Sequence, residues 1–202
     1  MFDVLIIGGG VSGVSCALVL GSAYKKTFVS SKKIGIITHQ KTSSLQEALF
    51  NNAYGIAPGK LGSELLTEST AQLAHLYPHV SQISNEKVVQ IEGEYPNFVV
   101  KTNKNSYQTK IIVLAVGYSN TFAIEGLMHY VAKHPKAVVE KERIFLKNFD
   151  HKVAEGIYVA GTLAGWRSQL AIAAGSGAAV ATDILTLWND GIDSQSHDSI
   201  KK

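Results

Sequence analysis

The stretch 2-FDVLIIGGGVSGVSCALVL-20 decides the fold of this chain. Its first six residues form an apolar run rich in branched side chains, which predicts a buried β-strand, and residues 14–20 predict an α-helix. The glycines between them follow the pattern G-x-G-x-x-G. In this pattern Gly8 allows a tight turn, Gly10 lets the backbone approach a diphosphate, and Gly13 lets the helix pack closely on the strand. On its own the pattern also fits an ordinary turn, but its place directly after a buried strand favours dinucleotide binding, because a helix N-terminus attracts phosphate.

Length and composition predict one large ordered globular domain, or a domain with a small appendage. The chain has 202 residues, of which 46% are hydrophobic and 17% charged, and its formal net charge is +3. The lysines are scattered along the chain, so we expect no nucleic-acid partner. The single cysteine, Cys16, leaves this sequence without an internal disulfide or a C-x-x-C redox pair.

Two apolar segments could be mistaken for a signal peptide and for a membrane span. Near the start, Asp3 stands where a signal peptide carries basic residues, and three glycines interrupt the apolar run. Residues 170–188 are long and weakly polar, but they are rich in alanine and glycine and poor in large apolar side chains. We therefore expect a cytoplasmic protein with no membrane partner.

The remaining segments predict an α/β fold with a central parallel sheet and an accessory antiparallel β-meander. Residues 33–38 predict a second parallel strand, and three runs within residues 88–114 predict the meander. The last of these runs ends in the continuously apolar residues 111–115, as is typical of a central buried strand. Residues 156–160 predict another buried strand, and residues 169–188 predict a long helix.

The second strand ends without the usual acidic residue. In many dinucleotide sites a carboxylate at this position binds the ribose hydroxyls, and this chain offers Thr38, His39 and Gln40 instead. A hydroxyl or an amide can still hydrogen-bond a ribose, so these residues remain candidate contacts.

Together these segments, in this order, make the chain resemble the FAD-binding domain of thioredoxin reductases within the FAD-dependent pyridine nucleotide-disulfide oxidoreductases. The resemblance runs from Asp3 to about Leu187 and implies a Rossmann-like FAD/NAD(P)-binding fold. Besides the glycine loop, it rests on 52-NAYG-55, 109-TKIIVLAVG-117, 156-GIYVAGT-162 and 169-QLAIAAGSG-177.

Carried over position by position, the resemblance implies how FAD would lie. The diphosphate would rest on the glycine loop, the adenine against the backbone of Val88, and the flavin ring near Asn52, with its pyrimidine end at the helix that begins around Gln169. It leaves the catalytic side chains unknown, and we expect no metal site. The implied cofactor-binding residues are Gly8, Gly10, Val11, Ser12, Gly13, Thr38, His39, Gln40, Asn52, Val88, Ala115, Gly117, Gly161, Thr162, Gln169 and Leu170.

Three features depart from the family pattern. The family's terminal motif has an aspartate after its second glycine, where this chain has Thr162. The redox C-x-x-C is absent, which argues against a dithiol or disulfide reductase. Residues 118–155, where the family inserts its NADPH domain, number only 38 and hold no glycine fingerprint, too few for a second nucleotide-binding domain of roughly 100 residues.

The expected organisation is a single FAD-binding domain over residues 1–188, with residues 118–155 as a shortened insertion. That insertion contains strand-like pieces at residues 137–139 and 143–146. Residues 189–202 are polar without an apolar period, so we expect a flexible C-terminal tail.

The insertion and the segment before the last helix supply further candidates. His129 or His134, with Tyr118, could form a lid over the flavin and donate a proton, although ordinary surface histidines are the simpler explanation. Trp166 and Arg167 could cover the ring or bind a substrate anion, or they could simply pack and be solvated.

The expected function is a small FAD-dependent oxidoreductase. It would take electrons from transiently bound NAD(P)H or from a partner protein and pass them to a small molecule, with the redox chemistry supplied by the flavin. The alternatives are a non-catalytic flavin or nucleotide sensor, a subunit of a split reductase, and a protein that binds only NAD(H) or ADP-ribose through the glycine loop. The missing domain leaves surface that a partner can cover, so a homodimer is a candidate arrangement.

Overall fold

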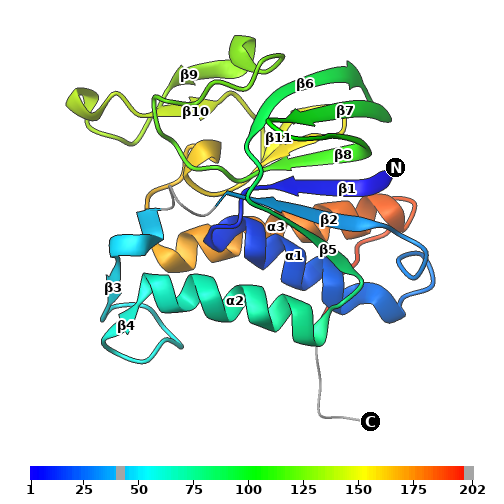
Figure 1. The fold of residues 1–202 in the computed structure, drawn as a ribbon, viewed down its shortest axis with the longest axis horizontal. Helices are drawn as coiled ribbons and strands as arrows, with labels where there is room; N and C mark the ends of the chain where they lie inside the picture. The colour runs from blue at the N-terminus through cyan, green and yellow to red at the C-terminus, as the bar shows by residue number, and fades with distance from the viewer. Residues whose placement is uncertain (40–43, 198–202) are drawn as a thin grey trace.

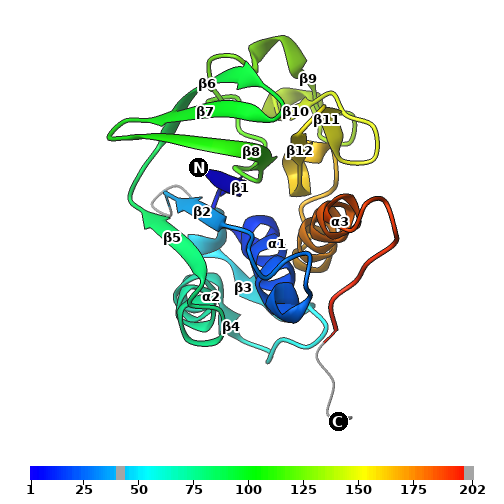
Figure 2. The same cartoon turned by 90° about the vertical axis from the view of Figure 1, so that its right-hand side faces the viewer.

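The computed structural model describes residues 1–39 and 44–197, and it confirms the α/β fold with a mainly parallel central sheet. Along the sheet the strands run in the order β11-β12-β8-β1-β2-β5 (Figures 1 and 2). Neighbours in this order are parallel, except that β11 is antiparallel to β12. The strands are β1 (Phe2–Ile7), β2 (Ile34–Thr38), β5 (Val80–Ser84), β8 (Ser106–Leu114), β11 (Lys152–Ala154) and β12 (Ile157–Val159).

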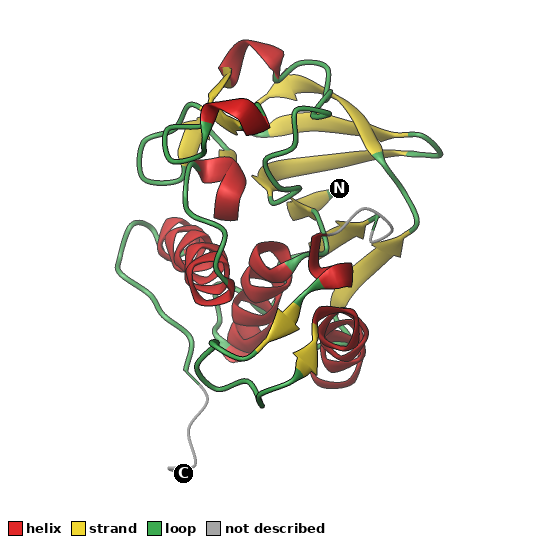
Figure 3. Cartoon of the chain, turned by 90° about the vertical axis from the view of Figure 1, so that its left-hand side faces the viewer, coloured by secondary structure: helices red, strands yellow, loops and turns green. Residues whose placement is uncertain are grey.

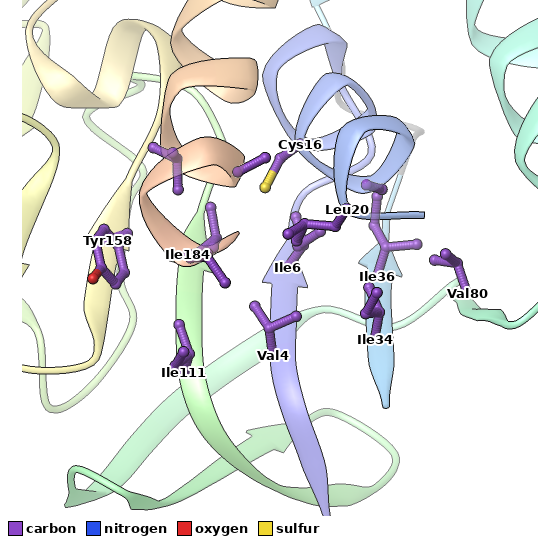
Figure 4. Close-up of a cluster of buried hydrophobic side chains, with 14 of the residues drawn as sticks. Val4, Ile6, Cys16, Leu20, Ile34, Ile36, Val80, Ile111, Tyr158 and Ile184 are labelled. Carbon is purple, nitrogen blue, oxygen red and sulfur yellow. The ribbon is translucent and has the colours of Figure 1, made fainter. Parts of the chain in front are cut away.

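The central strands are apolar throughout because both faces of the sheet are covered. On β1, Val4 and Ile6 belong to the buried cluster on the helix side, whereas Leu5 and Ile7 belong to the cluster on the opposite side. Figure 4 shows the helix-side cluster, in which Ile6 lies near Leu20 of the first helix. The unbroken apolar run that predicted a buried strand is thus explained by two cores, one on each side.

Three helices cover one face of the sheet (Figure 2): α1 (Val11–Ser22), α2 (Gly62–Leu76) and α3 (Leu170–Trp188). The closest packing is between α1 and α3. A Cβ added to Gly177 of α3 would lie 2.0 Å from the backbone oxygen of Ser12, so glycine at this position allows the two helices to approach. The small side chains of α3 therefore bring its N-terminal end next to that of α1.

The predicted β-meander covers the other face. It consists of β6 (Val88–Glu94), β7 (Asn97–Thr102) and β8, paired antiparallel in sequence order. Because β8 also pairs in parallel with β1, the meander continues directly from the central sheet (Figure 1).

Residues 118–155, expected to be a shortened insertion, pack against the central sheet and the meander. They contain the hairpin of β9 (Val131–Lys133) and β10 (Ile144–Leu146), as well as the edge strand β11. Leu127 and Leu146 are buried in the meander-side core. The strand predicted near residues 143–146 is confirmed, whereas the one at residues 137–139 is wrong: Val138 and Val139 are exposed, and no strand pairs with them in the described chain.

A second hairpin, of β3 (Leu49–Phe50) and β4 (Lys60–Leu61), lies just before α2 (Figure 3). Its tip extends away from the core, and Tyr54 there is fully exposed. Short 3-10 segments connect other elements, at Ala23–Lys25, Ser44–Glu47, Met128–Tyr130, Val139–Lys141 and Gly161–Ala164.

The described part of the C-terminal segment folds back onto the helices. The backbone N–H of Ser194 donates to Thr186 Oγ1 of α3 at 3.1 Å, and the hydroxyl of Ser22 in α1 donates to Ser196 at 2.8 Å. Residues 189–197 thus have contacts that the expected flexible tail did not include, and residues 198–202 lie outside the described chain.

Helix α3 is long and apolar enough, by length and composition, to cross a membrane, with a mean hydropathy of 1.6. A single such helix is weak evidence for a membrane span, because core helices pass the same test. In this structure a third of that apolar stretch is buried, and Val180, Ile184 and Leu185 of α3 lie completely buried in the helix-side core.

Candidate functional site

A cavity of about 740 Å³ opens at the carboxyl ends of the central strands, where open α/β sheets bind their ligands. The strand ends reach it through Ile7, Ile37, Ala115 and Ala160. Its size falls within the range of small-molecule and cofactor pockets. Eleven of the sixteen predicted cofactor contacts line it: Gly8, Gly10, Val11, Ser12, His39, Val88, Ala115, Gly117, Thr162, Gln169 and Leu170.

The glycines of the first loop have three different surroundings. Gly8 has φ +119°, and an added Cβ would lie 2.4 Å from the backbone oxygen of Ala115, so it makes the tight turn. Gly13 lies directly against Gly8, whose backbone oxygen would be 1.9 Å from an added Cβ. At Gly10, in contrast, an added Cβ would meet nothing within 4 Å. The loop therefore leaves open space at Gly10, on the cavity side, where a ligand can approach the backbone.

Two helix N-termini meet this cavity. Helix α1 begins after Gly10 and α3 begins after Gln169, and neither has a side-chain cap or an acidic residue in its first turn. The first N–H groups of a helix have no intrahelical partners, and the helix dipole makes this end positive. The N-termini of both helices therefore favour a negatively charged ligand in the cavity.

The second glycine segment lies behind the cavity wall. Gly161 has φ +72°, and an added Cβ would lie 2.2 Å from Ser12 Oγ. Its N–H donates to Ser176 Oγ at 2.7 Å, and that hydroxyl is 2.9 Å from Nε2 of the buried His151. This arrangement ties the end of β12 to α3 and leaves the next residue, Thr162, on the cavity surface.

Five predicted contacts do not line the cavity. Gly13 and Gly161 are buried in the helix–sheet packing described above, and Thr38 is buried at the end of β2, its carbonyl accepting a hydrogen bond from the N–H of Glu86. Asn52 is exposed because the β3–β4 hairpin carries it away from the core. Gln40 lies outside the described residues.

The candidate proton donors of the insertion are not available in the cavity. His134 is buried, its Nδ1 accepts a hydrogen bond from the N–H of Lys136 at 3.1 Å, and its Nε2 is 3.1 Å from the carbonyl oxygen of Thr162. This pattern requires the neutral ring with the proton on Nε2, so both nitrogens are occupied by the backbone. His129 is exposed and does not line the cavity, whereas Tyr118 does.

Trp166 and Arg167 also lie outside the cavity lining. Trp166 is partly exposed and has Lys136 Nζ 4.2 Å from its ring centre, with the ring of His151 stacked at 6.2 Å. Simple packing therefore explains Trp166, and Arg167 is exposed to solvent.

The charged residues of the lining that the sequence did not single out include Glu86 and Arg143. The carboxylate of Glu86 accepts hydrogen bonds from Thr102 Oγ1 (2.6 Å), Asn105 Nδ2 (2.7 Å) and the Tyr107 hydroxyl (2.9 Å). These donors, Thr102 above all, hold the pKa of Glu86 below its ordinary value. Both residues reach the cavity through tertiary packing, so no local sequence pattern could have identified them.

Other reactive groups give no competing site. The described residues contain no group of three or more histidine, cysteine or acidic side chains that could hold a metal ion. The thiol of Cys16 is completely buried in the helix-side core, and burial raises its pKa.

Sequence comparison identifies one family. A family model described as pyridine nucleotide-disulphide oxidoreductase matches residues 2–162. Among curated proteins, a ferredoxin–NADP reductase of Pediococcus pentosaceus is 28% identical over 167 residues, which cover 80% of this chain and 47% of that protein. The uncharacterized oxidoreductase CzcO of Bacillus velezensis is 27% identical over 143 residues, covering 66% of this chain and 41% of that protein. The chain spans about half the length of the curated relatives it matches.

Solved structures share the fold at low sequence identity. An oxidoreductase of Agrobacterium tumefaciens has a TM-score of 0.72 at 14% identity, covering 92% of this chain and 98% of that chain. The atypical thioredoxin reductase of Desulfovibrio vulgaris Hildenborough has a TM-score of 0.70 at 13% identity, covering 95% and 99%. These similarities establish the fold around the cavity.

Proposed function

The chain belongs to the pyridine nucleotide-disulphide oxidoreductase family, and on that premise we propose that it is a flavin-binding oxidoreductase whose cofactor is FAD. One observation carries the proposal: a glycine loop and two uncapped helix N-termini line a single cavity at the carboxyl ends of the parallel strands. This combination suits an elongated anionic dinucleotide.

The residues present fit FAD. The open space at Gly10 and the first N–H groups of α1 would hold the diphosphate, and Val88 would lie against the adenine. The N-terminus of α3, at Gln169 and Leu170, would stabilise negative charge at the flavin end. When bound, FAD supplies the electron-transfer chemistry, and the protein supplies its orientation and electrostatic surroundings. Thr162 would hydrogen-bond the cofactor without adding negative charge.

The source of electrons would lie outside this domain. Residues 118–155 form a hairpin and an edge strand, which supports transient NAD(P)H or a redox partner protein as the donor and a small molecule as the acceptor. Disulfide reduction is disfavoured because the only cysteine of the sequence, Cys16, is buried with a raised pKa.

A second candidate is a non-catalytic flavin or nucleotide binder, either a sensor or one subunit of a split reductase. His134, a candidate proton donor, favours this alternative, because both of its ring nitrogens are bonded to the backbone. Turnover would count against this alternative.

The test is the visible absorption spectrum of the purified protein before and after anaerobic addition of NADH and NADPH, with the released cofactor identified by mass. Flavin bands that bleach are expected of a nicotinamide-linked oxidoreductase. Bound flavin that stays oxidised favours reduction by a partner protein or a sensory role. A colourless protein that takes up no added FAD would refute the flavoprotein proposal.

A further inference from the structure

Arg143 is placed in the cavity without a partner for its charge. It is half-buried, directly before β10, and lines the same cavity as the glycine loop and Thr162. Its Nε is buried and makes no hydrogen bond, and no carboxylate of the described chain lies within ion-pairing distance of its guanidinium. An unpaired buried donor on a cationic group is costly, which points to a partner that the described residues do not supply.

Packing holds the guanidinium in place. Its Cζ is 4.9 Å from the ring centre of Tyr118, a cation–π contact, and Tyr118 also lines the cavity. The backbone on both sides of this contact is fixed: the N–H of Ile144 donates to the carbonyl of Tyr118, and the N–H of His134 donates to the carbonyl of Arg143. A guanidinium that packs on a ring, with the backbone of both residues hydrogen-bonded, is pre-organised for a ligand.

The other charges of the cavity leave this position open to an anion. Glu86 is the acidic residue among the described lining, and its carboxylate is already hydrogen-bonded to three side chains of the meander. Lys87 adds a further positive charge to the lining. The lining therefore lacks an acidic group available to neutralise Arg143.

We propose that Arg143 is an anion-binding residue of this cavity and takes a ligand with paired oxygens, a phosphate or a carboxylate. A planar guanidinium binds such groups through two parallel hydrogen bonds, which an ammonium group cannot reproduce. Two sources share this chemistry: the diphosphate of the bound dinucleotide, and an anionic group of the substrate. The proposal deepens the proposed function, because it assigns an anion-recognising residue to the same cavity.

The test uses the full chain and three variants. Arg143→Met removes the charge, Arg143→Lys keeps the charge without the planar group, and Arg167→Met removes the other arginine of the sequence, which is exposed outside the cavity. Calorimetric titration of the flavin-free protein with ADP and with adenosine tests the diphosphate source. Titration of the flavin-loaded protein with phosphate and with acetate tests the substrate source.

If Arg143 binds the diphosphate, Arg143→Met weakens ADP binding roughly 10- to 100-fold, Arg143→Lys has an intermediate effect, and adenosine binding is unchanged. If it binds a substrate anion, ADP binding is unchanged and phosphate or acetate binding to the flavin-loaded protein falls by a similar factor. Arg167→Met should match the wild type in every titration.

Equal binding of all probes by the wild type and Arg143→Met would overturn the proposal, as would a wild type that binds no anion. A general loss of structure in Arg143→Met would weaken adenosine and ADP alike, and Arg143→Lys then decides, because it should still separate the two ligands. The ADP titration needs no flavin, so a protein that binds ADP through Arg143 but takes up no FAD would refute the proposed function and leave this inference standing.

Discussion

Gly10 offers a way to separate cofactor binding from folding. An alanine there adds a Cβ that meets nothing within 4 Å, and its backbone, at φ −81° and ψ −173°, is in the extended region open to any residue. Alanine is a poorer N-cap than glycine, but it reduces the entropy of the unfolded chain, and these effects are opposite in sign and similar in size. We therefore expect Gly10→Ala to change the free energy of unfolding by less than about 0.5 kcal/mol.

Binding should respond far more strongly, because the added methyl group occupies the open space at the start of α1. A phosphate oxygen kept away from the helix N-terminus loses at least one charge-assisted hydrogen bond, worth about 1.5–3 kcal/mol. That range corresponds to roughly 10- to 100-fold weaker binding of FAD or ADP, with little change in adenosine binding.

The assay is a titration of apoprotein with FAD, followed by flavin fluorescence and paired with urea unfolding of the same preparations. Gly175→Ala is the matched control, since Gly175 is an exposed helix residue outside the cavity lining, and its added Cβ also meets nothing within 4 Å. It should stabilise the protein by about 0.5–1 kcal/mol and leave FAD binding unchanged. A folded Gly10→Ala protein that binds FAD and ADP as tightly as the wild type would refute the assignment of the diphosphate to this loop.

Three further outcomes follow from packing and charge. Gly177→Ala should destabilise the protein by about 3 kcal/mol in urea, because its Cβ would lie 2.0 Å from a backbone oxygen of α1; stability equal to that of Gly175→Ala would contradict the packing. Glu86→Gln should lower the free energy of unfolding by about 1–3 kcal/mol at pH 7, whereas Glu94→Gln, at an exposed position, should leave it almost unchanged. Since the pKa of Glu86 is lowered from 4.5, its stabilisation is fully present above that pH and is lost as the pH falls through the lowered pKa, so a gap between wild type and Glu86→Gln that does not shrink on acidification would be inconsistent. Cys16 should react with a thiol reagent only after unfolding, and rapid reaction of the native protein would show that the core opens.

The sequence predicted the elements whose local pattern matches their surroundings. The apolar run of β1 and the glycine loop were identified because a buried parallel strand and a tight turn need particular residues at adjacent positions. The strand expected at residues 137–139 failed because branched side chains favour a strand only where a partner strand and a buried face exist. Val138 and Val139 have neither in the described structure, and both are more than half exposed.

The candidate site also contains some residues that the sequence could predict and others that it could not. Gly8 and Gly10 could be predicted as cavity residues because they are neighbours in sequence as well as in space. Gly161 was expected beside the cofactor but packs against Ser12, a contact between segments about 150 positions apart. Arg143 could not be predicted at all, because the path from the insertion to the cavity depends on how the β9–β10 hairpin packs.

Thr162 and Arg143 change the charge of the cavity in the same direction. Thr162 is neutral where the resemblance led us to expect an aspartate, and Arg143 adds a positive charge from residues 118–155. Compared with a cavity that has the aspartate and lacks the arginine, this one is more positive by two charges, and the hydrogen-bonded carboxylate of Glu86 does not offset them. Because charges act more strongly in a partly desolvated cavity than in water, this difference favours anionic ligands at the N-termini of α1 and α3. The threonine in place of the expected acid therefore does not argue against the proposed dinucleotide; together with Arg143 in the same cavity, it favours the binding of phosphate.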